Sequence, residues 1–283
     1  MAKVYEALRK AEEERKRRAG DEISPVAPLD VPPVSARAPV SKVDREPLWK
    51  RVTPSLRRRQ RENVGEVNKR RISVLQPDSY VAEQFRTLRG RIDAISAQRP
   101  IRTLAVSSPM AGEGKTTAAI NLSAVTSMSV DRRVLLVDCD MRKPKVHQAL
   151  GLHPEAGLAE VLTGEVSLEE AIVKVEGLNL EVLAVRGRPS NPSELLSSPS
   201  MRELVAKVAA RYDKVILDTP AALGVPDAKA VAELVDGVVL VVRADVTSQQ
   251  DVEAALELLD RGRILGVVLN GAHVDHGRYG YTG

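Results

Sequence analysis

The stretch SSPMAGEGKTT, residues 107–117, decides the fold of this 283-residue chain. It follows a short apolar run that ends at Val106, and a segment of helical composition begins near Thr116. A glycine-rich turn that opens a helix points backbone N–H groups and the positive helix end at a phosphate. Lys115 would reach the terminal phosphates, and the Thr116 hydroxyl could bind Mg²⁺. The sequence therefore predicts a phosphate-binding loop between a strand and a helix.

The loop departs from the strict motif at one position. Pro109 stands where the strict spacing has glycine, so the remaining Gly-Lys-Thr core is by itself a weak signal. The apolar strand before it and the helix after it supply the structural context that the motif needs. We therefore keep the interpretation as a phosphate-binding loop.

Short apolar runs alternate with helical stretches on both sides of this loop. The runs are residues 102–106, 133–137, 178–185, 214–217, 237–242 and 264–269. Amphipathic segments such as residues 200–212 and 248–261 separate several of them. This alternation predicts an α/β fold with a mostly parallel sheet and helices on both faces. Right-handed crossovers then bring the carboxyl ends of the strands to one edge, where ligands bind.

The composition agrees with an α/β protein of a reducing compartment. Aromatic residues make up only 2% of the chain, so Val, Leu, Ile and Ala must fill the core. The single cysteine, Cys139, excludes an internal disulfide framework, and its two flanking aspartates should raise its pKa and make it a poor nucleophile. The most apolar run, residues 237–242, is too short to cross a bilayer. We expect a soluble, cytoplasmic protein.

The chain divides into four predicted parts. Residues 1–18 should form a short helix, residues 19–70 a disordered basic linker, residues 71–270 the nucleotide-binding domain and residues 271–283 a flexible tail. Lys and Arg outnumber Asp and Glu in residues 1–71, whereas the reverse holds for the rest of the chain. The basic arm is either a solvated linker or a segment attracted to anionic lipid or an acidic partner.

Three aspartates follow apolar runs of the predicted sheet. VLLVDCDMRKP, residues 134–144, carries Asp138 and Asp140, and KVILDTP, residues 214–220, carries Asp218. They could be strand-end caps, or they could face Mg²⁺ and the reacting phosphate, with one of them accepting a proton. Because their strands end at the edge that holds the phosphate loop, the second interpretation is favoured.

These motifs together resemble those of the bacterial tyrosine kinases, the BY-kinase family, over about residues 79–283. SSPMAGEGKTT, VLLVDCDMRKP and VILDTP look like its Walker A, Walker A′ and Walker B motifs, and NPSELL at residues 191–196 is also similar to the family. The related partitioning and septum-site ATPases usually carry a signature lysine where this chain has Met110. The Asp-x-Asp pair followed by Arg142 favours the kinases.

The resemblance implies a role for each site residue. Lys115, Asp138 and Asp140 would be catalytic, with Asp138 as the base for the tyrosine proton, although exchanging Asp138 and Asp140 stays open. ATP and Mg²⁺ would be the cofactors, and Thr116, Asp140 and Asp218 would bind the metal directly or through water. The implied nucleotide-binding residues are Met110, Ala111, Gly112, Glu113, Gly114, Lys115, Thr116, Thr117 and Asn270, the last of which resembles the residue that hydrogen-bonds adenine.

The resemblance also implies self-association. EQFRTLR supplies Glu83, Arg86 and Arg89, which match the motif that joins neighbouring subunits into a ring. The tail tyrosines Tyr279 and Tyr281 match a cluster that the adjacent subunit phosphorylates. This tail has only two tyrosines, fewer than many members of the family carry.

The function that follows is an ATP-dependent protein-tyrosine autokinase that regulates capsule or exopolysaccharide polymerisation and export. Its implied partners are a membrane-embedded polysaccharide co-polymerase, which would activate the kinase and recruit it to the inner face of the membrane, and a tyrosine phosphatase. No specific nucleic acid is expected. The alternatives are a MinD- or ParA-like ATPase switch that positions cargo, and a pseudokinase scaffold that binds nucleotide without significant chemistry.

Overall fold

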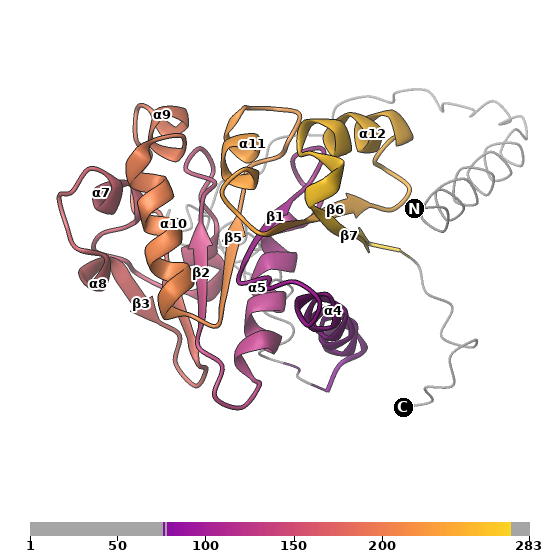
Figure 1. The fold of residues 1–283 in the computed structure, drawn as a ribbon, viewed down its shortest axis with the longest axis horizontal. Helices are drawn as coiled ribbons and strands as arrows, with labels where there is room; N and C mark the ends of the chain where they lie inside the picture. The colour runs from indigo at the N-terminus through magenta and orange to yellow at the C-terminus, as the bar shows by residue number, and fades with distance from the viewer. Residues whose placement is uncertain (1–75, 77, 273–283) are drawn as a thin grey trace, which may run out of the picture. The chain divides into compact units, whose positions relative to one another are not determined.

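The computed structural model describes residue 76 and residues 78–272, and these residues are built around a single seven-stranded sheet (Figure 1). The strands run in the spatial order β3-β4-β2-β5-β1-β6-β7. Their bounds are β1 Thr103–Ser107, β2 Val134–Asp138, β3 Ile172–Lys174, β4 Leu180–Leu183, β5 Lys214–Asp218, β6 Gly237–Arg243 and β7 Ile264–Asn270. All pairs of neighbouring strands are parallel except β3 and β4.

The helices connect these strands and cover the sheet. They are α4 Tyr80–Ser96, α5 Lys115–Ser127, α6 Val146–Leu150, α7 Leu158–Leu162, α8 Leu168–Ala171, α9 Pro192–Leu196, α10 Pro199–Arg211, α11 Asp227–Ala232 and α12 Gln249–Leu258, with a 3₁₀ turn at Arg261–Arg263. Pro192 and Pro199 each occupy the first helical position, where a missing N–H costs nothing. Ser79, Ser198 and Ser248 cap the starts of α4, α10 and α12 with their hydroxyls.

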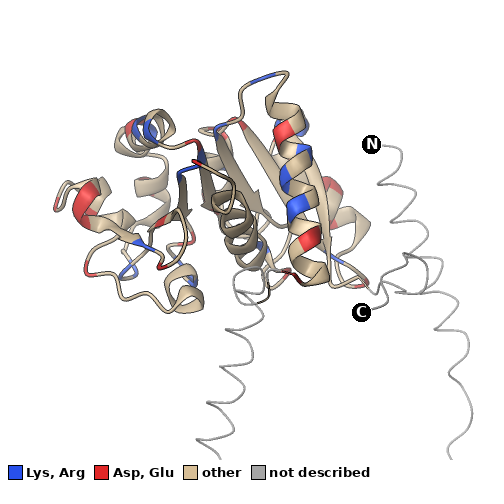
Figure 2. Cartoon of the chain, turned by 90° about the horizontal axis from the view of Figure 1, so that it is seen from below, with Lys and Arg blue, Asp and Glu red and all other residues tan. Residues whose placement is uncertain are grey.

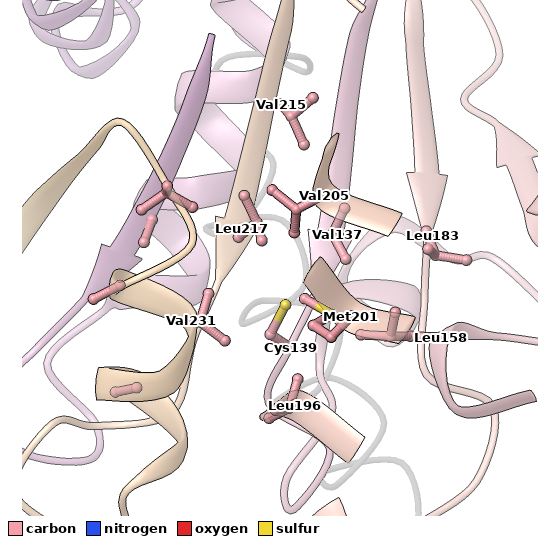
Figure 3. Packing of buried hydrophobic residues seen from close by; sticks show 14 of the residues in the cluster. Val137, Cys139, Leu158, Leu183, Leu196, Met201, Val205, Val215, Leu217 and Val231 are labelled. Atoms are coloured by element: carbon pink, nitrogen blue, oxygen red, sulfur yellow. The ribbon is translucent and has the colours of Figure 1, made fainter. Parts of the chain in front are cut away.

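Alternate residues of each central strand enter two separate cores. Leu135, Val137, Val215 and Leu217 face the side covered by α7 to α12, and Figure 3 shows this packing around Met201 of α10. The intervening residues face the side covered by α4, α5 and α6, and they include Leu136 and Ile216. Figure 2 shows that the charges lie mainly on the helices and loops, while the middle of the sheet is nearly free of them. The predicted helices on both faces are confirmed.

Helix α5 is buried almost all round, because it lies between the sheet and α4. It is made largely of Ala, Ser and Thr, so it can approach both layers closely. The Ser123 and Thr126 hydroxyls donate to the carbonyl oxygens four residues earlier, at 2.7 and 2.6 Å. The helix that follows the phosphate loop is therefore held in place on both sides.

The six predicted strands are all present, although the run at residues 178–185 gives a strand of only four residues, Leu180–Leu183. The sequence analysis missed β3, which has three residues and pairs antiparallel with β4 at the edge of the sheet. A segment this short shows no periodicity, so its pairing depends on β4.

The carboxyl ends of the central strands meet as predicted. Asp138 of β2 pairs in register with Asp218 of β5, and Asp218 pairs on its other side with Val106 of β1. The phosphate loop leaves β1 directly after Ser107. The predicted helix at residues 1–18, the linker at 19–70 and the tail beyond Ala272 lie outside the described residues, so these divisions stay predictions.

Candidate nucleotide-binding site

The loop between β1 and α5 has the backbone geometry of a phosphate cradle. Gly112 and Gly114 have φ angles of 90° and 99°, in the left-handed region that favours glycine. At Gly114 a side chain is also excluded by space, since a Cβ there would lie 2.1 Å from the Asn270 amide nitrogen. Gly114 is the N-cap of α5, so Lys115 and Thr116 begin the helix whose positive end faces the loop.

Glu113 and Asn270 hold this loop from outside the cleft. The buried Glu113 carboxylate accepts the Met110 N–H at 2.9 Å and the Thr247 hydroxyl. The Asn270 amide donates to the Glu113 carbonyl oxygen at 2.8 Å. The Met110 side chain is 48% exposed. These three predicted nucleotide-binding residues therefore shape or flank the loop and do not line the cleft.

A cleft of about 470 Å³ opens beside the loop. Three segments form its walls, namely the phosphate loop, the turn after β2 and the turn after β5. The lining residues are Ala111, Gly112, Gly114, Lys115, Thr116, Thr117, Asp140, Arg142, Lys143, Lys145, Pro220, Ala221, Gly224 and Val225. The cleft thus has four cationic side chains and one carboxylate, which is a balance suited to a polyanion such as a nucleotide phosphate chain.

Lys115 and Asp140 form an ion pair in this cleft. The Lys115 Nζ lies 2.8 Å from the Asp140 Oδ2, and both side chains are about nine-tenths buried. Burial lowers the pKa of Lys115, but the charges of Asp218, Asp140 and Asp138 outweigh this effect and raise it above its usual value. The ammonium therefore stays charged, as phosphate binding requires.

Asp138 lies beneath the cleft and does not line it. Its carboxylate is fully buried and accepts the backbone N–H groups of Asp140, Lys145 and Val146 at 3.1 to 3.2 Å. Burial, with a contribution from Asp218, raises the pKa of Asp138 to about 8. Asp138 ends β2 and Asp140 lies beyond the strand, so the two carboxylates lie in different environments.

Asp218 is a buried carboxylate for which the protein supplies no hydrogen bond. It is fully buried at the end of β5, and neither oxygen has a hydrogen-bond partner among the residues that the structure describes. Burial raises the pKa of Asp218 to about 6, against the opposing effects of the Lys115 charge and the Thr116 hydroxyl. Orphaned carboxylate oxygens beside a phosphate loop fit a divalent cation or the water molecules that such a cation holds.

The described residues contain no cluster of three or more His, Cys, Asp or Glu side chains that could hold a metal by themselves. Mg²⁺ is usually bound through one or two carboxylates and the phosphates of a nucleotide. Thr116, Asp140 and Asp218 are the protein groups that fit such a site.

The sequence analysis missed a polar cluster at the rim of the cleft. The Arg142 Nε donates to Asp227 Oδ2 at 2.8 Å, and the Arg142 Nη2 donates to the Ser193 hydroxyl at 2.8 Å. Burial would raise the pKa of Asp227, but the bonds from Arg142 and Ser193 lower it below its usual range. Arg142 and NPSELL were noted only as family motifs, and nothing in their spacing indicated that they meet at Asp227.

Other predicted residues lie away from the cleft. Glu83 and Arg86 pair with each other on the surface of α4, whereas the Arg89 Nη1 donates to the Val125 carbonyl oxygen of α5 at 2.6 Å. Tyr279 and Tyr281 lie outside the described residues. Cys139 is fully buried, and burial with the neighbouring aspartates raises its pKa well above the usual value, as predicted.

The fold and the cleft define an α/β protein of the P-loop nucleotide-binding class. A family model described as an AAA domain matches residues 101–263. The chain is 39% identical over 227 residues to the tyrosine-protein kinase YwqD of Bacillus subtilis, covering 79% of this chain and 95% of that protein. It therefore belongs to the family of bacterial tyrosine-protein kinases, as the sequence motifs predicted.

Further similarities extend this result. The chain is 36% identical to the succinoglycan biosynthesis transport protein ExoP of Rhizobium meliloti, over 71% of this chain but only 26% of that protein. Among solved structures, the chimerical protein CapA2B2 matches with a TM-score of 0.69 and 32% identity, over 72% of this chain and 91% of that one. The cell division ATPase MinD of Pyrococcus furiosus matches less well, with a TM-score of 0.52 and 26% identity over 59% of this chain and 71% of that one.

No helix among the described residues is long and apolar enough to cross a membrane.

Proposed function

We propose that this kinase transfers the γ-phosphate of MgATP to Tyr279 or Tyr281 of a neighbouring copy. The observation that carries the proposal is the buried Asp218 carboxylate, which has no hydrogen-bond partner among the described residues and lies close to the Lys115–Asp140 ion pair at the phosphate loop. A charge buried without a partner costs stability, so it indicates a site prepared for a ligand. Mg²⁺ would neutralise charge on the phosphates when bound.

The groups at and around the phosphate loop then have distinct roles. The backbone N–H groups of the loop from Gly112 to Thr117 hold the β and γ phosphates, and Lys115 supplies a fixed positive charge. Thr116, Asp140 and Asp218 hold the metal, directly or through water. Asn270 flanks the loop at Glu113, where the adenine end of the nucleotide would be bound.

Asp138 is the proposed base for the tyrosine proton. Its raised pKa of about 8 is nearer to that of a phenol, which is about 10, than an ordinary carboxylate is. Asp138 must reach the phenol from beneath the cleft, whereas Asp140 already lines the cleft and is held by Lys115. Exchange of the two roles is therefore the alternative that a matched pair of Asn variants decides.

The tail is the proposed acceptor. Tyr279 and Tyr281 follow Asn270 by about nine to eleven residues, which reach at most roughly 30 to 40 Å when extended. This length favours delivery into the cleft of an adjacent subunit. Replacing both tyrosines by Phe should remove most of the phosphotyrosine and leave nucleotide binding unchanged. Phosphate mapping mainly to Tyr5, Tyr80 or Tyr212 in the wild-type protein would show that the tail is not the substrate.

The proposed assembly is a ring joined through the helix face of Glu83, Arg86 and Arg89. A tail docked in the neighbouring cleft links two subunits, and a phosphorylated tail would meet Asp138, Asp140 and Asp218 and be expelled. Phosphorylation should therefore disassemble the ring, and a tyrosine phosphatase would restore it. Light scattering before and after incubation with MgATP measures this change in mass, and an unchanged mass contradicts it.

The proposed setting is the cytoplasmic side of a membrane, where a membrane-embedded polysaccharide co-polymerase recruits and activates the kinase. Support comes from the similarity to a succinoglycan biosynthesis transport protein, of which this chain matches about a quarter. Polymerisation and export of a capsule or exopolysaccharide would be the regulated process.

One experiment tests the proposed activity. The full chain is incubated with MgATP, with and without the cytoplasmic segment of the co-polymerase, and analysed by intact mass and phosphotyrosine detection. An added phosphate on tyrosine supports the kinase. ATP hydrolysis with ATP-dependent dimerisation and no phosphotyrosine would favour the MinD- or ParA-like switch, and nucleotide binding with no turnover would favour the scaffold. No specific nucleic acid should bind in any of these cases.

A further inference from the structure

We propose that Asp227 and Ser193 are positioning residues that fix the Arg142 guanidinium at the cleft, so that its free nitrogen, Nη1, binds the phosphoryl group in transfer. The inference rests on the proposed kinase function. It assigns a shared purpose to Arg142 and Ser193, which lie in separate motifs, and to Asp227, which lies in none of them.

The contacts form a closed triangle around the guanidinium. Arg142 donates from Nε to Asp227 Oδ2 at 2.8 Å and from Nη2 to Asp227 Oδ1 at 3.3 Å and to Ser193 Oγ at 2.8 Å. The Ser193 hydroxyl itself donates to Asp227 Oδ1 at 2.6 Å. Nη1 makes no hydrogen bond within the part of the chain that the structure describes. The Nε and Nη2 side of the planar guanidinium is therefore fixed, and the Nη1 side is available to an anion.

The three residues come from three different parts of the fold. Arg142 lies in the turn after β2, Ser193 in α9, and Asp227 is the first residue of α11. The Asp227 side chain is fully buried, whereas 40% of the Arg142 side chain is exposed, and Arg142 lines the cleft. The anchor is thus rigid and the anchored group faces solvent at the site, which is the arrangement expected for a preorganised ligand contact.

The charges of the cleft explain why a fixed arginine is useful there. Lys115 is paired with Asp140, and the buried Asp138 and Asp218 add negative charge beneath the site. A phosphoryl group that leaves its nucleotide needs further positive charge on the acceptor side. Lys143 and Lys145 also line the cleft, but neither side chain makes a hydrogen bond or ion pair to a described residue that would hold its ammonium in place. Apart from Lys115, Arg142 is therefore the cleft cation whose position is fixed by hydrogen bonds to other described side chains.

A purely structural role is the competing explanation, since Asp227 also begins α11 and binds α9 through Ser193. The two explanations differ in what a double substitution does. If Asp227 acts through Arg142, then Asp227→Asn should cost turnover in the wild-type background and cost little more once Arg142→Lys is present.

The kinetic test uses the full chain and four variants: Asp227→Asn, Arg142→Lys, the double variant, and Glu169→Gln. The last breaks the surface Glu169–Arg211 ion pair remote from the cleft and serves as the matched control. We expect Asp227→Asn and Arg142→Lys each to lower the autophosphorylation kcat by about tenfold or more, with little change in the KM for ATP. The double variant should resemble Arg142→Lys, and the control should match wild type. Unchanged kcat in Asp227→Asn, or losses that multiply in the double variant, would overturn the proposal.

A binding test separates this inference from the proposed function. We expect Arg142→Lys and Asp227→Asn to weaken a non-hydrolysable ATP analogue by about three- to tenfold while leaving ADP affinity within about twofold, because only the analogue carries the terminal phosphoryl group. An equal loss of affinity for the ATP analogue and for ADP, or no loss for either, would refute the contact between Arg142 and the terminal phosphoryl group. If the wild-type protein forms no phosphotyrosine, the proposed function fails, and this affinity ratio still decides the role of Arg142.

Asp227 is fully buried, so its variant could lose stability. Ser193→Ala removes a single member of the triangle and should fold normally, with a smaller, few-fold loss of kcat and the same selective loss of analogue affinity. A Ser193→Ala protein with wild-type values for both quantities would remove Ser193 from the proposal.

Discussion

The two ends of β5 carry buried charges of opposite sign, and the protein provides for them differently. At the amino end, Lys214 is 6% exposed and its ammonium donates to the Ile101 carbonyl oxygen. At the carboxyl end, four residues later along the same strand, Asp218 is fully buried with no hydrogen bond from any described residue. One strand thus has a satisfied charge at one edge of the sheet and an unsatisfied charge at the other.

The neighbouring strands repeat this difference. At the amino edge, one oxygen of Asp236 accepts the Arg102 N–H, the Thr103 N–H and the Thr103 hydroxyl at 2.8 to 2.9 Å. At the carboxyl edge, the charged groups of the cleft lie close together, and the pKa of Asp218 is raised. Polar groups that stabilise a fold are paired within the protein, whereas polar groups that bind a ligand often have no partner until the ligand is bound. The comparison therefore locates the site without reference to any motif.

The largest effect is expected at the carboxyl edge. Lys115→Met should lower MgATP-dependent phosphotyrosine formation by at least about 100-fold, because it removes a preorganised charge from the developing phosphate. The backbone of the loop is held independently by Glu113 and Asn270, so the fold should stay intact. The melting temperature should nevertheless fall, because the buried Lys115–Asp140 ion pair is lost. Phosphotyrosine detection and thermal unfolding measure the two quantities. Undiminished phosphotyrosine in this variant would refute the site assignment.

The second prediction concerns the stability of the protein without nucleotide or metal. The pKa of Asp218 is about 6 in the folded chain and near 3.8 in the unfolded chain, so the folded state favours the protonated form. This preference stabilises the fold below about pH 4 and is lost as the pH rises through 6. Asp218→Asn should therefore raise the free energy of unfolding by about 1 to 3 kcal/mol at pH 8. At pH 4 the gain should be much smaller.

Asp138→Asn is the matched control for this prediction. Asp138 is equally buried, but its oxygens accept three backbone N–H groups, and an amide has only one oxygen to accept them. The pKa of Asp138 is also raised, to about 8, so loss of its charge should favour folding at pH 8, but the loss of backbone hydrogen bonds should offset that gain. Denaturant unfolding of both variants at the two pH values should therefore show the larger gain for Asp218→Asn. A loss of stability in Asp218→Asn at pH 8 would contradict the idea that Asp218 lacks a partner in the protein.

The third prediction tests the amino edge. Asp236→Ala removes the acceptor of two backbone N–H groups and one hydroxyl, so it should lower the free energy of unfolding by about 1 to 3 kcal/mol. Because Asp236 lies at the opposite end of the sheet from the cleft, nucleotide affinity of the folded variant should equal that of wild type. Isothermal titration with ADP provides the check, and a selective loss of ADP affinity would break the contrast between the two edges.

Much of this arrangement could be predicted from the sequence because it depends on local patterns. The apolar runs gave six of the seven strands, and the glycine spacing gave the phosphate loop, since both signals lie within a few residues of each other. The three aspartates were assigned to one edge because parallel strands end together. The short strand β3 could not be predicted, since it forms only by pairing with β4.

The details of the site depend on contacts between distant segments. Asp138 and Asp140 are two residues apart in the sequence, yet one accepts backbone N–H groups beneath the cleft and the other pairs with Lys115. Asp227 could not be identified at all, because its partner Arg142 is 85 residues away. The composition of a motif therefore predicts which chemistry is present, and the tertiary structure decides which oxygen performs it.

The smallest effects are expected on α4. There, one residue of the predicted assembly motif is bonded within its own chain and the other two form an exposed ion pair. The sequence predicts one assembly face for Glu83, Arg86 and Arg89, but the Arg89 guanidinium is already bonded to the Val125 carbonyl oxygen of its own chain. Arg89→Ala should therefore lower the free energy of unfolding by about 0.5 to 1.5 kcal/mol. Glu83→Ala removes only an exposed ion pair and should change it by less than about 0.5 kcal/mol.

For assembly we expect the opposite ranking, with Glu83→Ala acting on assembly alone and Arg89→Ala acting mainly through stability. Among the described residues, the side chains of Glu83 and Arg86 hydrogen-bond only to each other, within α4. Their charges are therefore available to a neighbouring subunit. Light scattering of the unphosphorylated protein should show that Glu83→Ala reduces the assembled mass at unchanged melting temperature. For Arg89→Ala, any loss of mass should come with a lower melting temperature, because its bond to α5 is lost as well. An unchanged mass in Glu83→Ala would contradict a role for the exposed Glu83–Arg86 ion pair in assembly.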